Sequence, residues 1–264
     1  MKFKKLLTLA LSSAILVSVV GCSKGTDNNK IVVGASSSPH AEILEVIKPQ
    51  LEEQGYELEI KVFDDYILPN TALDEGSLDA NYFQHVPYLE ETIKEKGYKL
   101  TYTEKVHLEP IGLYSDKVKS LDEIKENSTI AIPNDPTNGA RALKLLADNG
   151  LISIKDGELI SIKDIVKNPK NLEIKEMNAE QLPTVLKDVE GAVINTNYAI
   201  SAKLNPIKDA IVIESTDSPY SNILAVREDN KDSEKIKALS KALTSKEVKE
   251  FIEKEYQGSI IPSF

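Results

Sequence analysis

From residue 30 onward the chain alternates short runs rich in β-branched residues with longer stretches whose apolar residues recur at helical spacing. The first unit consists of IVVGA (31–35), a helical stretch at 41–54 and LEIKVF (58–63). Further β-rich runs lie at 129–133, 172–176, 191–195 and 210–214, and further helical stretches at 138–149, 179–187, 233–243 and 245–255. Strands that alternate with helices usually pair in parallel, with the helices covering the sheet. The pattern therefore predicts an α/β fold built on a parallel sheet.

Two extended, proline-containing stretches interrupt this alternation, VHLEPIGLY (106–114) and STDSPYSNILAVR (215–227). Each is suited to crossing between two lobes, and the roughly 235 residues that follow the amino-terminal segment are enough for two modest lobes. Two crossings make the first lobe discontinuous. We therefore predict one lobe from residues 30–108 and 218–264, a second lobe from 111–214, and a ligand cleft between them.

The amino terminus has the composition of a secretion signal. Three lysines precede fifteen uncharged residues, 6–20, which are too few to span a bilayer that requires about 20. The run VVGC (19–22) contains the only cysteine of the chain and resembles the lipobox of bacterial lipoproteins, in which the cysteine is lipidated and becomes the first mature residue. We expect a signal peptide at 1–21, lipid on Cys22, and a polar tether at 22–29 on the extracytoplasmic face of the cell membrane.

The mature chain is strongly acidic. Residues 1–21 contain three lysines and no acidic residue, so cleavage changes the formal net charge from −10 to −13. Nucleic acid is an unfavourable partner for such a chain, because phosphate binding requires a basic surface. The nucleophile elbow Gly-x-Ser-x-Gly and the glycine-rich phosphate-binding loops are absent from the sequence. We therefore predict no catalytic residue and no cofactor.

The three histidines of the chain, His40, His85 and His107, have a spacing that matches no metal-binding motif. A cluster of all three with an acidic residue in the folded chain is one alternative. Capping or core positions are the other, and the one we favour. His40 follows Pro39 at the start of a helical stretch, where an imidazole commonly caps or packs. We therefore predict no metal site.

Arg141 is the first candidate for contact with a ligand. It lies in the first turns of the helix that PNDPTNG (133–139) opens. There it can hold a carboxylate both by a bidentate ion pair and beside the positive end of the helix. The alternative is a surface arginine paired with any nearby acid.

Aromatic residues cluster in NYFQHVPYLEE (81–91), which holds three of the 15 Phe and Tyr residues of the chain. Such rings either line a ligand pocket or belong to the core. Because side chains alternate along a strand, Tyr82 points away from the face that carries Phe83, and we expect Tyr82 to be structural.

Several segments taken together resemble the methionine-binding lipoproteins of bacterial ABC importers, the NlpA family. The matching segments are VGASSSPHAEIL (33–44), FDDYILPNTAL (63–73), DANYFQHVPYL (79–89), GYKL (97–100), IPNDPTNGARAL (132–143), NPKNLEIKEMNAEQLP (168–183), AVINTNYA (192–199) and SPYSNILAVRED (218–229). The resemblance runs from about Ile31 to Phe264. It implies a two-lobed periplasmic-binding-protein fold of type II, which closes on an amino acid and delivers it to an ABC permease driven by a separate ATPase.

The resemblance also implies ligand-binding roles for seven residues: Tyr66, Phe83, His85, Tyr88, Arg141, Asn195 and Asn222. Methionine presents a carboxylate, an ammonium and a thioether. Arg141 would hold the carboxylate, the two asparagines would bond to the carboxylate and the ammonium, and the three rings would line the thioether slot. His85 would bond to the ligand or orient a ring. His107 and Glu109, in EKVHLEP (104–110), receive no role.

The ligand class is better defined than the ligand itself. L-Methionine is the expected ligand, with D-methionine, a Gly-Met-like dipeptide or another small amino acid as alternatives. A surface enzyme that acts on an amino-acid derivative is a further alternative, which the missing nucleophile and metal motifs disfavour.

Overall fold

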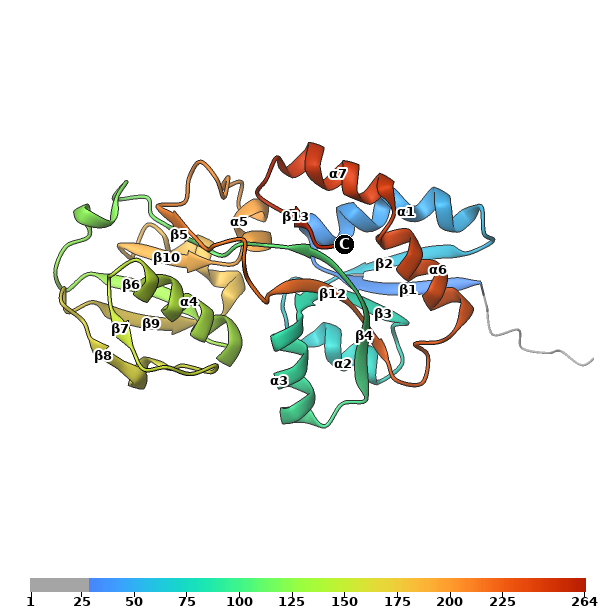
Figure 1. Cartoon of the computed structure of the whole chain (residues 1–264), viewed down its shortest axis with the longest axis horizontal. Helices are drawn as coiled ribbons and strands as arrows, with labels where there is room; N and C mark the ends of the chain where they lie inside the picture. The colour runs from blue at the N-terminus through green and yellow to red at the C-terminus, as the bar shows by residue number, and fades with distance from the viewer. Residues whose placement is uncertain (1–28) are drawn as a thin grey trace, which may run out of the picture.

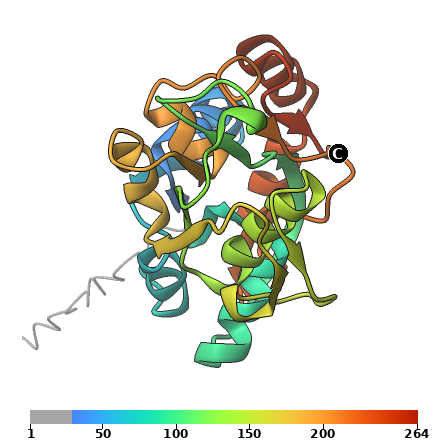
Figure 2. The same cartoon turned by 90° about the vertical axis from the view of Figure 1, so that its left-hand side faces the viewer.

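The computed structural model describes residues 29–264, so the predicted signal peptide, the predicted lipidation site Cys22 and nearly all of the predicted tether lie outside the described residues. Within the described part, two α/β bodies lie side by side, and the chain passes between them (Figure 1). The same arrangement is seen end-on in Figure 2, where the body built on the second sheet faces the viewer. No helix of the described part has the length and apolar character needed to cross a membrane.

The first sheet has six strands in the order β13-β4-β12-β3-β1-β2. Its strands are β1 (Lys30–Ala35), β2 (Glu57–Val62), β3 (Ala80–His85), β4 (Leu100–Leu108), β12 (Ser221–Arg227) and β13 (Ile261–Pro262). Strand β1 pairs in parallel with β2 and β3, whereas β12 is antiparallel to both β3 and β4. The prediction of a parallel sheet is therefore wrong. Strand β12 returns from the other body and enters at the end where β3 stops, so it must run in the opposite direction.

The second sheet has five strands in the order β11-β5-β10-β6-β9. They are β5 (Gly112–Tyr114), β6 (Thr129–Pro133), β9 (Glu173–Met177), β10 (Gly191–Ile194) and β11 (Val212–Ile213). Strand β6 is parallel to β9 and β10, and β5 is antiparallel to β10 and β11. A small hairpin of β7 (Ser153–Ile154) and β8 (Ile165–Lys167) was not predicted. Both sheets are thus mixed.

The helices are α1 (Glu42–Glu52), α2 (Leu68–Asp74), α3 (Val86–Lys96), α4 (Pro136–Asp148), α5 (Thr196–Ser201), α6 (Glu234–Leu243) and α7 (Lys246–Tyr256), with a π-helical turn η1 (Ser37–Ala41) and 3₁₀ turns η2 (Leu121–Glu123), η3 (Ile162–Asp164) and η4 (Ala179–Val185). Helices α1, α4, α6 and α7 lie where helical stretches were predicted, whereas α2 and α5 were not predicted. The stretch predicted as a helix at 179–187 is the 3₁₀ segment η4. It contains Pro183, which has no N–H to donate to an α-helical hydrogen bond.

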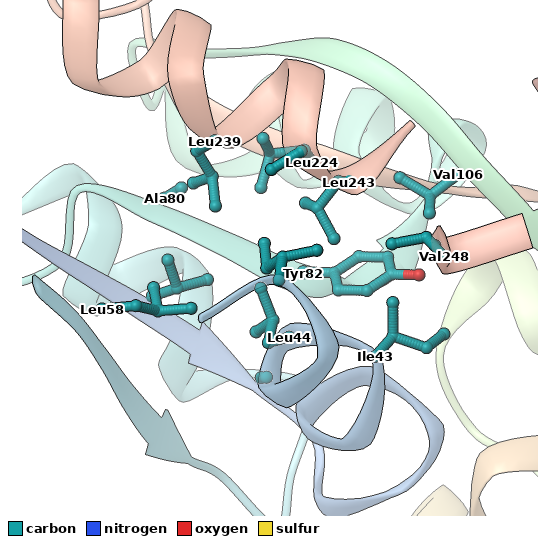
Figure 3. Close-up of a cluster of buried hydrophobic side chains, with 14 of the residues drawn as sticks. Ile43, Leu44, Leu58, Ala80, Tyr82, Val106, Leu224, Leu239, Leu243 and Val248 are labelled. Atoms are coloured by element: carbon teal, nitrogen blue, oxygen red, sulfur yellow. The ribbon is translucent and has the colours of Figure 1, made fainter. Parts of the chain in front are cut away.

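The core of the first body lies between its sheet and helices α1, α6 and α7, which pack on one another. Figure 3 shows Tyr82 among Ile43, Leu44, Leu243 and Val248. Tyr82 is fully buried, so the strand alternation in β3 does place this ring in the core. A separate cluster, which includes residues of α4, fills the second body.

The chain crosses between the sheets at 109–111, which joins β4 to β5, and at 214–220, which joins β11 to β12. The two crossings touch, because Glu214 N donates to Ile111 O at 2.9 Å. The strands of the first sheet come from residues 30–108 and 221–262, and those of the second come from 112–213. That these parts behave as two lobes with the predicted boundaries stays a prediction.

Candidate ligand-binding site

A cavity lies where the two bodies meet, with about 320 Å³ of space free of protein atoms, part of which is open to solvent. It is lined by Tyr66, Phe83, Gln84, His85, Tyr88, Glu109, Asn138, Arg141, Asn195, Thr196 and Asn222. All seven residues singled out in the sequence are among them. The other four were not predicted.

Three rings from three different elements form an aromatic wall of the cavity. Tyr66 precedes α2, Phe83 lies in β3, and Tyr88 lies in the first turn of α3. The centroid of the Tyr66 ring lies 5.8 Å from that of Phe83 and 5.9 Å from that of Tyr88. Tyr88 Oη donates to the Tyr66 carbonyl at 2.9 Å, and Tyr66 Oη donates to Asn197 Oδ1 at 2.5 Å. The wall is therefore held both within the first body and against the second.

His85 ends β3 and caps α3. Its Nδ1 accepts a hydrogen bond from Tyr88 N at 3.1 Å, and its Nε2 lies 3.1 Å from Asn138 Oδ1. Because Nδ1 accepts, the proton of the neutral ring must be on Nε2, which donates to Asn138. Burial, reinforced by the positive charge of Arg141, lowers the pKa of His85 to about 3. His85 is thus a neutral, fixed ring that orients Tyr88 and Asn138.

Arg141 is buried, with only 3% of its surface exposed, so it is not a surface arginine. It is nevertheless paired with an acid, because Nε donates to Glu214 Oε1 at 2.9 Å and Nη2 bonds to Glu214 Oε2. Nη2 also donates to the Glu109 carbonyl at 2.6 Å, and the guanidinium lies 4.4 Å from the centre of the Tyr220 ring. Nη1 is the nitrogen left without a protein acceptor among the described residues.

Helix α4 positions Asn138 and Arg141 in the cavity wall. Asp135 caps the helix by accepting from Asn138 N at 2.8 Å, and it also accepts from Asn138 Nδ2 at 3.1 Å. This fixes the Asn138 amide with its oxygen toward His85 and Asn195. Asn195 Nδ2 donates to that oxygen at 2.8 Å, which leaves the buried Asn195 Oδ1 without a hydrogen-bond partner among residues 29–264. A buried acceptor without a partner in a cavity wall indicates that a bound ligand donates a hydrogen bond to it.

Next to the cavity, which Glu109 and Asn222 line, lies a buried polar cluster of Tyr82, His107, Glu109 and His40, which connects to Asn222. His107 Nε2 is 2.7 Å from Glu109 Oε1, and His40 Nε2 is 3.2 Å from the same oxygen and 2.9 Å from Asn222 Oδ1. Burial lowers the pKa of His40 to about 4 and that of His107 to about 3, and burial raises the pKa of Glu109. Both rings are therefore neutral.

The same cluster bears on metal binding. His40, His107 and Glu109 bring one donor atom each within 4.8 Å of one another, which is a spacing that can hold a metal ion. His85 does not join them, so the three histidines do not form one cluster. His85 caps α3, and His40 and His107 are fully buried, so all three hold the capping or core positions that the sequence favoured. His40 of η1 and His107 of β4 are far apart in the chain but meet because both rings pack against Tyr82 and against each other, a contact that no sequence motif records.

Two α/β bodies with a cavity of aromatic and polar side chains between them are the architecture of substrate-binding proteins that clamp a small ligand. Residues 31–264 match the model of the NlpA lipoprotein family. The chain belongs to this family. It is a substrate-binding protein of the ABC-transporter type and not an enzyme.

Relatives support the same assignment over nearly the whole chain. The methionine-binding lipoprotein MetQ of Bacillus subtilis is 46% identical over 264 residues, 96% of each chain. The D-methionine-binding lipoprotein MetQ of Escherichia coli K12 is 44% identical over 268 residues, 98% of each chain. A nutrient-binding protein of Burkholderia cenocepacia, solved bound to methionine, is 47% identical with a TM-score of 0.86, and covers 89% of this chain and 100% of its own.

Proposed function

We propose that this chain captures methionine in the cavity between its two bodies and delivers it to the permease of an ABC importer, which a separate ATPase drives. The observation that carries the proposal is the chemical division of the cavity. One wall is built from the rings of Tyr66, Phe83 and Tyr88, and elsewhere the lining carries a guanidinium and amide groups. Relatives that cover nearly the whole chain are methionine-binding proteins, and one of them was solved with methionine bound.

The polar groups fit the two charged ends of an amino acid. Arg141 Nη1 is the guanidinium nitrogen available to a ligand carboxylate, since Glu214 and the Glu109 carbonyl use the other two. Asn195 Oδ1, buried and without a partner in the described chain, accepts from the ligand ammonium. In this proposal Asn222 completes the set of polar contacts, and His85 acts through Tyr88 and Asn138 rather than by ionising.

The aromatic wall fits an unbranched thioether. Sulfur–ring contacts contribute roughly 0.3–1.5 kcal/mol each, and three rings surround the proposed slot. The slot does not distinguish the two enantiomers by itself, because the stereocentre lies at the polar end. We therefore include D-methionine as a ligand to be tested.

Membership of a lipoprotein family places the protein on the extracytoplasmic side of a membrane. We propose that lipid on Cys22 is the anchor and that residues 22–29 form the tether. This arrangement keeps the binding protein close to the permease.

Calorimetric titration of the full lipoprotein in detergent micelles, after dialysis to remove bound ligand, tests the proposal. L-Methionine, D-methionine, Gly-Met and cysteine are compared. We expect saturable binding of L-methionine with a stoichiometry of one. Binding of Gly-Met or cysteine with no heat from either methionine enantiomer would overturn it.

A further inference from the structure

Asn222 lies in β12 and lines the cavity, and its amide can point either way: oxygen or NH₂ toward the ligand. The two orientations have opposite consequences. With the oxygen inward, Asn222 accepts from an ammonium; with the NH₂ group inward, it donates to a carboxylate. The orientation of the amide is set by its hydrogen bond on the side away from the ligand. On that side lies the buried cluster of Tyr82, His107, Glu109 and His40.

The direction of the hydrogen bonds in this cluster is set by Tyr82. The hydroxyl of this fully buried ring has one hydrogen-bond partner among residues 29–264, namely His107 Nδ1. The phenol proton must be donated to Nδ1, because otherwise it would be buried without an acceptor. His107 then carries its own proton on Nε2 and donates it to Glu109 Oε1 at 2.7 Å.

Glu109 is consequently an acceptor through both oxygens. Oε1 accepts from His107, and Oε2 accepts from the backbone N–H of Asn197 at 3.1 Å. Burial raises the pKa of Glu109, whereas His40, Arg141 and the Asn197 N–H oppose that rise. With both oxygens accepting hydrogen bonds, the carboxylate form of Glu109 has no proton to donate to His40.

His40 therefore faces Glu109 with an N–H group. Its Nε2 lies 3.2 Å from Glu109 Oε1 and 2.9 Å from Asn222 Oδ1, and its Nδ1 lies 2.6 Å from Ser36 Oγ. A lone pair on Nε2 would face the Glu109 oxygen, which is unfavourable, so the proton is on Nε2 and the serine hydroxyl donates to Nδ1. The His40 N–H holds the oxygen of Asn222 on the protein side.

We propose that His40 is a positioning residue that fixes Asn222 with its NH₂ group toward the cavity, so that Asn222 recognises a hydrogen-bond acceptor of the ligand. The proposal rests on the proposed function only for the identity of that acceptor. Since the carboxylate is the strong acceptor of methionine, Asn222 and Arg141 bind the same end of the ligand. Tyr82, His107 and Glu109 set the direction in which His40 donates.

Two substitutions of His40 by side chains of equal length separate its role as a hydrogen-bond donor from its role in packing. His40→Gln retains an N–H₂ group near the position of Nε2, whereas His40→Met has the same length without a donor. We expect the methionine variant to bind L-methionine about tenfold more weakly, because the Asn222 amide is then free to turn, and the glutamine variant to bind like wild type. Titration calorimetry measures both affinities, and thermal unfolding checks that both variants fold.

The same pair in the background of Asn222→Ala shows whether His40 acts through Asn222. If it does, the difference between His40→Gln and His40→Met disappears in that background. An equal difference in both backgrounds would overturn the proposal while leaving methionine binding intact. No binding of L-methionine by the wild-type protein would instead overturn the proposed function.

A spectroscopic measurement on the wild-type protein keeps the proposal testable if a His40 variant does not fold. The side-chain NH₂ resonances of Asn222 are identified by their absence from the spectrum of Asn222→Ala. We expect L-methionine to shift both the ¹H and ¹⁵N frequencies of this NH₂ group. Unchanged resonances at saturating L-methionine would show that the NH₂ group does not meet the ligand and would overturn the proposal.

Metal removal tests the competing use of the cluster. We expect dialysis against EDTA to leave the L-methionine affinity and the unfolding temperature unchanged, since each group of the cluster is satisfied by hydrogen bonds. A loss of either that Zn²⁺ restores would assign His40, His107 and Glu109 to a metal ion and overturn the hydrogen-bond assignment.

Discussion

At the scale of single residues, most of the Arg141 guanidinium is already bonded to protein groups, and only Nη1 is left for a ligand. Two of its nitrogens bond to Glu214 or to the Glu109 carbonyl, and the guanidinium group lies over the ring of Tyr220. These partners belong to the two crossings between the sheets, so the arginine is held rigidly by the segments that join the bodies. Preorganisation of this kind lowers the entropy lost on binding.

Removing this guanidinium should weaken binding strongly. For Arg141→Ala we expect a loss of about 2–5 kcal/mol in the free energy of L-methionine binding, because the ligand carboxylate is then buried without its cation. Calorimetric titration measures the loss, and Lys246→Ala, an exposed residue of α7, is the control. An Arg141→Ala protein that binds like wild type would remove Arg141 from the site.

At the scale of elements, the residue that caps helix α4 also fixes the orientation of a side chain in the cavity wall. Asp135 accepts from the backbone N–H of Asn138 and also fixes the Asn138 side chain, which in turn bonds to His85 and Asn195. Helix α7 has a comparable cap, Ser245, which accepts from Val248 N and lies away from the cavity. The two helices therefore offer a matched comparison of capping with and without a connection to the site.

Asp135→Ala should lower both stability and affinity. We expect a loss of about 1–2 kcal/mol in the free energy of unfolding, since the cap is removed and the Asn138 amide loses its acceptor. Ser245→Ala should cost about 1 kcal/mol of stability without changing L-methionine affinity. Urea unfolding and calorimetry give both quantities. Equal affinities for the two variants would show that the orientation of Asn138 does not matter for the ligand.

At the scale of the whole molecule, three buried histidines stay neutral in the folded protein. The pKa of His40 is lowered to about 4, and those of His85 and His107 to about 3, by burial. In the unfolded chain each would titrate near the usual value of 6.5. Below pH 6.5 the unfolded state therefore takes up protons that the folded state does not, and stability falls as the pH falls.

The free energy of unfolding should accordingly decrease between pH 6.5 and pH 5. Each such histidine contributes a slope of about 1.4 kcal/mol per pH unit once its unfolded form is fully protonated. Urea unfolding at several pH values measures this slope, and His107→Gln should reduce it by the share of one histidine. Below about pH 5 the carboxyl groups begin to contribute, so the comparison is confined to this window. Stability that does not change across the window would contradict neutral histidines.

The anchor also belongs to the scale of the whole molecule. We expect the wild-type protein to stay with the membrane fraction after a high-salt wash and Cys22→Ala to be lost from it, because two or more acyl chains are needed for stable attachment. Ser23→Ala is the control. Cys22→Ala protein that remained with the membranes would show that another part of the chain provides the anchor.

The sequence by itself determined the positions of α1, α4, α6 and α7 and of several strands, because apolar spacing and capping residues act over a few positions, but it did not reveal α2, α5 or the hairpin of β7 and β8. Asp135, Pro136 and the glycine after α4 mark that helix without any tertiary information. The candidate site residues were found differently. Spacing alone left Arg141 and the aromatic cluster ambiguous, and long ordered motifs carried the prediction that the seven residues share a site; the structure brings them around one cavity.

Only the tertiary structure decided the rest. The mixed first sheet depends on where β12 re-enters the first body, and the meeting of His40, His107 and Glu109 depends on contact between η1 and the end of β4. Glu214 and Tyr220, the partners of Arg141, come from the crossing at 214–220, and nothing in the sequence pairs either of them with Arg141. These contacts join residues far apart in the chain, and their geometry is fixed by the packing of two bodies rather than by any local preference.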